Sequence, residues 1–357
     1  MSVPTENKSL FLESKLGQFA VRSTETPKPG PDEILVKVEA TALNPLDWKV
    51  QSLGLFVEKY PAVLGFDACR DYFPGRRGRP HFVFRRWGSI VQGWYDAAKQ
   101  TTQGTFTQYF VLPYKFVAKV PASWSSEDAA TIPSGVTTAA FPLYNQNAAA
   151  SSVKLTAPWL EGGRGKYAGK PFLVLAGAAS MGQYVIQFAR LSGFSPIITT
   201  ASPHNAAFLQ TLGATHVLDR NLSSDQLVAE AKKIAGGPFE VVYDAVSTPD
   251  TLPVGYALTA QGGSLVVVNP DDELKSKGKV EGKDVHMAHG LFVTEVNHET
   301  GRTLLEALPA LLESGDIKPN PTEILPGGLN GIVGGLERLK NNQVSGVKLV
   351  VRPQETA

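Results

Sequence analysis

The sequence predicts an α/β protein of two domains, one built on a doubly wound parallel sheet and the other mostly of β-strands. The chain has 357 residues, more than a single hydrophobic core usually serves. Residues 172–268 alternate short apolar runs with helical segments of about ten residues, which is typical of βαβ units. Residues 32–120 contain instead short apolar pieces separated by Gly and Pro.

The β-rich part begins with a clear alternation. In residues 32–40, Val36 and Val38 fall on one face while Lys37 and Glu39 fall on the other, the pattern of a half-buried strand. Shorter apolar pieces of the same kind follow at 60–65, 106–113 and 115–120. Short strands at this spacing favour a small barrel.

The parallel-sheet part alternates regularly. Its apolar strands are expected at 172–176, 196–199, 216–218, 239–243 and 264–268. Its helices are expected at 181–191, 205–212, 225–234 and 250–258. Continuous apolar strands of this kind indicate a sheet that is buried on both faces.

Two segments flank that series. Residues 145–170 are small, polar and Gly-rich, and we expect a surface loop before the first parallel strand. After the series come a helix at 300–313 and a strand at 347–351. This final strand has no partner of its own, so we expect it to return to the first domain.

Composition excludes several classes of protein. With 43% hydrophobic residues, 19% charged residues and a net charge of +1, nothing indicates a nucleic acid or an anionic membrane as partner. Cys69 is the only cysteine, which excludes intramolecular disulfides and zinc sites built on cysteine; we interpret it as a small buried hydrophobe. No secretory signal and no run of 18 apolar residues occurs, so we expect a cytoplasmic protein without a membrane span.

The clearest functional pattern lies at residues 172–193, FLVLAGAASMGQYVIQFARLSG. A strand enters a tight turn with Gly177 and Gly182, and a helix begins at about Met181. Backbone N–H groups and the positive helix terminus together stabilise a pyrophosphate, and the small residues 176–180 let it approach closely. The spacing G-x-x-x-x-G departs from G-x-G-x-x-G, but the strand–helix units that follow support a dinucleotide site.

The second parallel strand distinguishes between two cofactors. NAD-specific sites place an acidic residue roughly 20 residues beyond the glycines, whereas residues 183–218 contain none. The strand ends instead in residues 200–205, TASPHN, whose hydroxyl, imidazole and amide groups can hold a 2′-phosphate. Arg220, after the third strand, adds a positive charge. Ser202 could alternatively only cap the next helix; the sequence favours NADP over NAD.

Five short motifs span nearly the whole chain. They are residues 42–49 (ALNPLDWK), 64–67 (LGFD), 134–139 (SGVTTA), 200–205 (TASPHN) and 344–349 (VSGVKL). In order and spacing the chain resembles the medium-chain dehydrogenase/reductase superfamily, specifically its zinc-independent quinone-reductase and enoyl-reductase branch. It is most similar to fungal trans-acting enoyl reductases and to dehydrogenases of secondary-metabolite clusters.

The resemblance implies a GroES-like, mostly β catalytic domain formed by residues 1–124 and 298–357, with a Rossmann domain at 125–297 between them. It implies that substrate and nicotinamide meet in the cleft between these domains. The implied reaction is NADPH-dependent hydride transfer to an enone, an enoyl group or a quinone, in fungal polyketide biosynthesis. The implied partners are a small-molecule substrate and a polyketide synthase or carrier protein, and related enzymes are monomers or homodimers.

Positions that match the family motifs imply roles for individual residues. Those near the nicotinamide ribose are Asn44, Pro45, Asp47 and Lys49. Those near the diphosphate are Gly177, Ala179, Ser180, Met181 and Gly182. Those at the 2′-phosphate are Ser202, His204 and Asn205, to which the residue pattern adds Arg220. Thr138 would lie beside the nicotinamide or the substrate. Those that complete the cofactor pocket are Asn269, Gly346 and Lys348.

The resemblance also predicts that zinc is absent. Zinc-containing members carry a Cys near position 44 and a Gly-His-Glu motif near position 65, where this chain has Asn44 and 65–67, Gly-Phe-Asp. Phenylalanine cannot bind a metal, and the structural lobe with four cysteines is missing. His286 and His289 stand three residues apart without a third ligand, and we interpret them as solvent-facing.

Without zinc, an alcohol substrate lacks a strong Lewis acid, so hydride addition to an activated C=C or a quinone fits best. The negative charge that develops on the carbonyl oxygen needs hydrogen-bond donors, and the candidates are Thr138, Lys49 and backbone N–H groups. Alternatively, Lys49 and Asp47 form a surface ion pair, and Thr138 packs the cleft. Two other functions stay open: a zinc-free alcohol or aldehyde dehydrogenase, and a non-catalytic NADPH-binding sensor or structural protein.

One segment departs from the family pattern. Residues 70–86, RDYFPGRRGRPHFVFRR, contain six arginines, and sequence similar to the family resumes at about Val91. Three interpretations remain: a solvated basic loop, a shifted reading frame or wrong exon boundary between residues 70 and 90, and a basic patch for an acidic carrier protein or coenzyme A.

Overall fold

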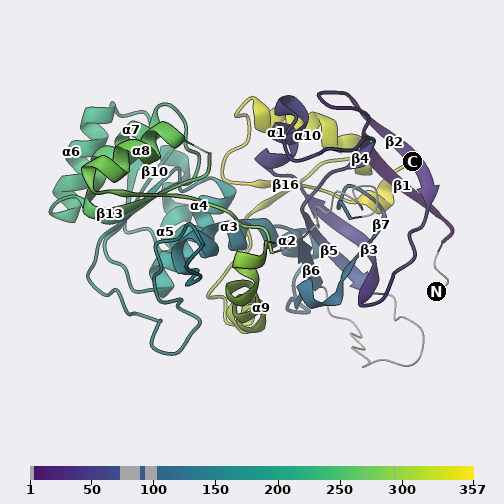
Figure 1. The fold of residues 1–357 in the computed structure, drawn as a ribbon, viewed down its shortest axis with the longest axis horizontal. Coiled ribbons are helices and arrows are strands. Elements are labelled where there is room, and N and C mark those ends of the chain that lie inside the picture. The colour runs from purple at the N-terminus through teal and green to yellow at the C-terminus, as the bar shows by residue number, and fades with distance from the viewer. Residues whose placement is uncertain (1–3, 73–88, 93–102, 270, 293) are drawn as a thin grey trace. The chain divides into compact units, whose positions relative to one another are not determined.

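The structure is a computed structural model that describes residues 4–72, 89–92, 103–269, 271–292 and 294–357 (Figure 1). The chain forms two compact units. Unit 1 consists of Met1–Ser134, Leu308–Glu313 and Pro319–Ala357, and unit 2 of Gly135–Ala307 and Ser314–Lys318. The predicted domain limits, at residues 124 and 298, stay a prediction. Most of the basic segment, residues 73–86, lies outside the described residues, so its three interpretations stay predictions.

Unit 2 contains the predicted doubly wound parallel sheet, with strand order β11-β10-β9-β12-β13-β14. Its strands are β9 (Phe172–Leu175), β10 (Ile197–Ala201), β11 (His216–Asp219), β12 (Phe239–Asp244), β13 (Thr259–Val267) and β14 (Asp284–Met287). The central strand β9 is buried along its whole length, as a continuous apolar strand between two neighbours requires. This is the Rossmann arrangement, and the predicted fold class is confirmed.

Helices cover both faces of the sheet. They are α4 (Ser180–Leu191), α5 (Ala206–Leu212), α6 (Ser224–Ala235), α7 (Thr251–Leu258) and α8 (Asp272–Glu281). Figure 1 shows α4 and α5 on one side and α6 to α8 on the other. On the second side, Leu227 of α6 and Val254 of α7 pack with Leu175 and Leu265 of the strands. Two further helices, α3 (Pro133–Tyr144) and α9 (His298–Glu313), have residues in both units.

Unit 1 is mostly β, as predicted. Its strands are β1 (Glu6–Leu12), β2 (Phe19–Glu25), β3 (Glu33–Ala42), β4 (Ala62–Val63), β5 (Asp67–Tyr72), β6 (Ser89–Gln92), β7 (Tyr109–Pro113), β8 (Val117–Lys119), β15 (Thr322–Ile324) and β16 (Lys348–Val351). They form sheets of order β2-β1-β4 and β15-β16-β3-β5-β6-β8, with β7 paired to β3. Its helices are α1 (Pro45–Leu53), α2 (Ser126–Ala130) and α10 (Gly331–Lys340).

Two strand predictions for unit 1 are confirmed. Val36 and Val38 of β3 are fully buried, whereas Lys37 and Glu39 on the other face are half-buried and joined by a 2.5 Å ion pair. The C-terminal strand β16 returns to pair antiparallel with β3. This pairing is what brings residue 348 beside the start of α1.

The predicted surface loop at 145–170 is wrong in one respect. It contains no helix or strand, but Trp159 is anchored in the apolar core. Its ring contacts Tyr144 and Phe188 edge-on at centroid distances of 5.3 and 5.7 Å, and its indole N–H donates to Thr303 Oγ1 at 3.3 Å. The small polar residues around Trp159 show no helical or strand periodicity, so the sequence did not predict that this side chain packs in the core.

Three single-residue predictions can be compared with the structure. Cys69 is 1% exposed, which confirms a small buried hydrophobe. His289 is exposed as predicted, but His286 is half-buried and burial lowers its pKa. Within the described ranges, no group of His, Cys, Asp and Glu could hold a metal ion. No described helix has both the length and the apolar character needed to cross a bilayer.

Candidate cofactor and active site

The turn between β9 and α4 is shaped by its two glycines. A Cβ at Gly177 would lie 2.1 Å from Thr199 Oγ1, and one at Gly182 would lie 2.5 Å from the carbonyl oxygen of Ala176. The backbone N–H of Gly177 donates to the carbonyl of Thr200 at 3.0 Å. Helix α4 therefore starts so close to β9 and β10 that neither position accepts a side chain.

The first turn of α4 fits an anion. Its N-cap, Ala179, has no side chain that caps the helix, and the first turn contains no acidic residue. The first N–H groups of a helix lack backbone acceptors and carry a partial positive charge. Ala179, Ser180 and Met181 are half-buried. A diphosphate at this terminus would receive the hydrogen bonds that a capping side chain usually provides.

The end of β10 carries the residues predicted to hold a 2′-phosphate. Ser202 precedes the short helix η2 (Pro203–Asn205), but its side chain makes no capping hydrogen bond. The alternative that Ser202 only caps the next helix is therefore wrong. Ser202 is half-buried, His204 is exposed and Asn205 is buried. The side chains of Ser202 and His204 are therefore accessible, whereas Asn205 is packed in the interior.

Arg220 lies beside this strand end, although it follows the next strand in the sequence. The pair Ala201 and Asp219 ends the register between β10 and β11, and the N–H of Arg220 donates to the carbonyl of Ala201 at 3.0 Å. Arg220 is exposed. The Asp219 carboxylate accepts the N–H of Asn221 at 3.0 Å, so it is engaged in its own loop. The predicted cation and the Ser202 backbone are thus neighbours.

The remaining predicted residues of unit 2 are held by hydrogen bonds and close packing. The Asn269 side-chain amide donates to the carbonyls of Val246 and Ser247 at 3.2 and 2.9 Å, which joins the loops after β12 and β13. The carbonyl of Thr138 accepts the Tyr243 hydroxyl at 2.7 Å. A Cβ at Gly290 would lie 2.2 Å from Thr138 Oγ1, so Gly290 lets the chain pack directly on this threonine.

Tyr243 also links Thr138 to the glycine turn. Its hydroxyl oxygen lies 3.3 Å from Met181 Sδ, and burial raises the pKa of this phenol well above its usual value. The sequence did not identify Tyr243 as a site residue, because a tyrosine inside an apolar strand is usually a core residue. The structure brings the predicted Thr138 and Met181 together through it.

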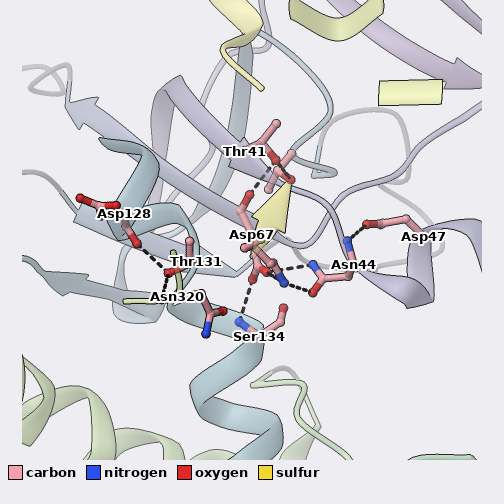
Figure 2. A network of polar contacts seen from close by, with 10 residues as sticks. Thr41, Asn44, Asp47, Asp67, Asp128, Thr131, Ser134 and Asn320 are labelled. Carbon is pink, nitrogen blue, oxygen red and sulfur yellow. Dashed lines mark hydrogen bonds and ion pairs between the residues drawn. The ribbon is translucent and has the colours of Figure 1, made fainter. Parts of the chain in front are cut away.

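In unit 1, three predicted residues meet in a buried polar network (Figure 2). The Asn44 N–H donates to Asp47 Oδ2 at 2.8 Å at the start of α1. The Lys348 ammonium donates to Asn44 Oδ1 at 2.6 Å, and the Asn44 amide donates to Asp67 Oδ2 at 2.8 Å. Asp47 and Asp67 are fully buried, and Lys348 and Asn44 are 4% and 9% exposed.

Asp67 is the centre of this network, and sequence reasoning missed its role. Its Oδ1 accepts the N–H of Ser134 at 2.7 Å, its Oδ2 lies 3.5 Å from Lys348 Nζ, and its carbonyl accepts the Thr41 hydroxyl at 2.6 Å. The available signal was its position, because it stands where zinc-containing relatives carry the Glu of Gly-His-Glu. Figure 2 shows Asp67 between Asn44 and Ser134.

Asp47 is a second buried carboxyl group. Its Oδ1 is buried with no hydrogen-bond partner among the described residues. Burial raises its pKa to about 8; the charge of Asp67 adds to the rise, and the Asn44 N–H and Lys348 oppose it. Because Asp47 is 0% exposed, the alternative of a surface ion pair with Lys49 is wrong.

The other predicted residues of unit 1 flank the network. Lys49 is half-buried, its ammonium lies 5.8 Å from the centroid of the Trp48 ring, and burial lowers its pKa. Pro45 is the first residue of α1, where its missing N–H costs nothing. Gly346 has φ of +73°, a left-handed conformation that favours glycine, two residues before Lys348.

The structure thus places the predicted residues in two sets. In unit 2, the glycine turn, the Ser202–Arg220 corner, Asn269 and Thr138 all adjoin the carboxyl ends of parallel strands, where this fold binds dinucleotides. In unit 1, Asn44, Asp47 and Lys348 share the buried network. A Rossmann sheet whose first turn fits a diphosphate is typical of proteins that bind a dinucleotide.

Known proteins agree with this class. A family model described as zinc-binding dehydrogenase matches residues 180–300. The dehydrogenase mokE of Monascus pilosus is 31% identical over 352 residues, which cover 91% of each chain. The trans-enoyl reductase himH of Aspergillus japonicus is 30% identical over 329 residues, which cover 89% of each chain. The structure of mycobacterial Rv1454c complexed with NADPH has a TM-score of 0.75 at 21% identity, covering 97% of this chain and 100% of that one.

The chain therefore belongs to the medium-chain dehydrogenase/reductase superfamily, in its enoyl-reductase-like branch. It is an oxidoreductase of that family, and the predicted resemblance is confirmed.

Proposed function

We propose that this chain is an NADPH-dependent reductase that adds hydride to the activated C=C of an enone or enoyl substrate, or to a quinone. The observation that carries the proposal is the glycine turn at the start of α4, with the Ser202–Arg220 corner on the neighbouring strands. Relatives named trans-enoyl reductases, and a similar fold that is complexed with NADPH, support it.

The residues present fit the cofactor. The uncapped first turn of α4 would hold the diphosphate, and Gly177 and Gly182 let this turn pack directly against β9 and β10. Ser202, His204 and Arg220 would hold the 2′-phosphate, because they offer donors and positive charge, and residues 183–218 contain no acidic side chain. When bound, the nicotinamide supplies hydride.

The residues of unit 1 and α3 would act on the substrate side. Asn44 and Lys348 would bind the nicotinamide ribose, and Asp47 would orient Asn44. Lys49 and the Thr138 hydroxyl would donate hydrogen bonds to the carbonyl oxygen, on which negative charge develops as the β-carbon accepts hydride. Thr138 is well suited because its backbone is fixed by Tyr243.

The setting of the reaction is part of the proposal. We propose a small-molecule acyl substrate, presented by a polyketide synthase or carrier protein in the cytoplasm. Whether the chain is a monomer or a homodimer is determined by measuring the mass of the purified protein in solution.

Turnover tests the proposal directly. The purified chain is mixed with NADPH or NADH and with enones, quinones or aldehydes, and the loss of absorbance at 340 nm is followed. We expect consumption of NADPH with the enones. Turnover of aldehydes alone would make the chain an alcohol or aldehyde dehydrogenase, and NADPH binding without any turnover would make it a sensor or structural protein.

A charge change tests the cofactor assignment. His204→Asp places a carboxylate at the predicted 2′-phosphate site, and the loss of one charge-assisted hydrogen bond costs about 1.5–3 kcal/mol, which is about 10–100-fold in Kd. We expect this loss for NADPH and little change for NADH. His216→Asp is the matched control, because His216 is also exposed but begins β11 at the opposite end of the strand. Equal losses for both cofactors would contradict the assignment.

A further inference from the structure

The carboxylate of Asp67 joins three segments that are distant in the sequence. One oxygen accepts the Asn44 amide and faces the Lys348 ammonium, and the other accepts the N–H of Ser134 at the start of α3. Asp67 is itself 0% exposed. Asp67 therefore has no exposed surface for a ligand, whereas its partners Lys348 and Asn44 keep 4% and 9% of theirs.

The first of these contacts concerns charge. Lys348 is 4% exposed, and a buried ammonium is costly unless it is paired and hydrogen-bonded. Asp47, with its pKa of about 8, carries little negative charge at pH 7, so Asp67 provides the anion that faces Lys348 at 3.5 Å. Asn44 provides the 2.6 Å hydrogen bond that fixes the direction of the ammonium.

The second contact concerns a helix. Ser134 is the second residue of α3, where N–H groups lack backbone acceptors. A carboxylate at this position both accepts the hydrogen bond and offsets the partial positive charge of the terminus. Thr138 follows Ser134 by four residues, one turn along the same face of the helix. The same carboxylate thus contacts both Lys348 and the first turn of the helix that carries Thr138.

We infer that Asp67 is a positioning residue: it fixes the Lys348 ammonium and the first turn of α3, so cofactor affinity and turnover depend on a side chain that touches neither cofactor nor substrate. The inference rests on the proposed function. A change at Asp67 alone, with every residue that contacts the cofactor unchanged, should therefore lower cofactor affinity and turnover.

The test compares two carboxylates of unit 1. Asp67→Asn keeps the shape but presents an amide donor either to Ser134 or to Asn44 and Lys348, and we expect at least a tenfold rise in KM for NADPH together with a lower kcat. Glu127→Gln is the matched control, because it removes the 2.5 Å ion pair with Arg352 at a side chain that is only 13% exposed. Each variant is also unfolded in urea, and we expect the control to lose stability without a change in KM.

A double-mutant cycle isolates the route through Lys348. We expect Asp67→Asn with Lys348→Met to bind NADPH within about threefold of Lys348→Met alone, because a residue that acts through another adds no further loss. Affinity losses that multiply would overturn the part of the inference that runs through Lys348. If Asp67→Asn does not fold alone, the double variant decides, because removal of both buried charges is tolerated better than removal of one.

The two proposals fail in different ways. If a fluorescence titration shows that the wild-type chain does not bind NADPH, the proposed function itself is overturned. A wild-type chain that binds NADPH, with an Asp67→Asn variant of equal KM and kcat, would overturn only the role of Asp67.

Discussion

At the scale of single residues, Asp47 makes the stability of the chain depend on pH. Its carboxyl group is fully buried, one oxygen has no hydrogen-bond partner among the described residues, and burial raises its pKa from 3.8 to about 8. The folded chain therefore keeps a proton that the unfolded chain releases. The contribution of this group to stability is fully present below pH 3.8 and is lost as the pH rises through 8.

We predict that Asp47→Asn flattens this dependence. Between about pH 5 and 8 the wild-type free energy of unfolding should fall with rising pH by up to ~1.4 kcal/mol per unit from this proton, and the variant should lack that slope. Urea unfolding at a series of pH values measures both.

Asp316→Asn is the control for that prediction. The Arg164 guanidinium beside Asp316 lowers its pKa, so its contribution is present above the unfolded pKa and is lost only as the pH falls through the lower folded value. Its removal should leave the slope between about pH 5 and 8 unchanged. A wild-type slope equal to that of Asp47→Asn would refute the prediction.

The sequence suggested candidate site residues but not the contacts that join them. Asn44, Asp47 and Lys348 were suggested by motif, yet the hydrogen bond between Lys348 and Asn44 joins residues 304 positions apart, and no local pattern carries such a distance. Asp67 and Tyr243 were missed for the same reason. Their burial among apolar neighbours makes them look like strand residues until the partners from other segments are known.

At the scale of elements, most strands and helices of unit 2 were predicted to within a few residues, because each has a continuous apolar run or a clear helical period. Helix α8 and strand β14, which follow that series, were missed. Helices α1 and α3 were not predicted. Helix α1 is nine residues long and begins at Pro45, and α3 contains Pro142 and no charged residue, so neither shows a polar and an apolar face. Helix α1 begins with a local capping box between Asn44 and Asp47, whereas the first turn of α3 donates to the distant Asp67.

The start of α4 gives a prediction at this scale. In Gly182→Ala, the new methyl group would lie 2.5 Å from the Ala176 carbonyl oxygen and 2.9 Å from Gly177 Cα, so helix and turn must separate. We expect a loss of about 1–3 kcal/mol in the free energy of unfolding and a larger proportional loss of NADPH affinity, measured by urea unfolding and by fluorescence titration.

Gly334→Ala is the matched helix variant. Gly334 is exposed in α10 and a Cβ there would meet nothing within 4 Å, so alanine should stabilise the helix by up to about 1 kcal/mol. If Gly182→Ala proved as harmless as Gly334→Ala, the turn would not be sterically tight, and the reason given for its two glycines would be wrong.

At the scale of the whole molecule, the predicted cofactor residues divide between the two compact units. The glycine turn and the Ser202–Arg220 corner belong to unit 2, whereas Asn44 and Lys348 belong to unit 1. One ligand that binds residues of both units should stabilise both. This expectation separates a cofactor held by the whole molecule from one held by the Rossmann sheet alone.

We therefore predict that NADPH protects backbone amides from hydrogen exchange in both units, at the start of α4 and around β16. At about 100 times its Kd it should add about 2.7 kcal/mol to the free energy of unfolding, visible as a rise in Tm. NADH at the same concentration should produce a smaller rise, because it lacks the phosphate that Ser202 and Arg220 are expected to hold. Protection confined to unit 2 would show that Asn44 and Lys348 do not bind the cofactor, and their buried network would then serve only the stability of unit 1.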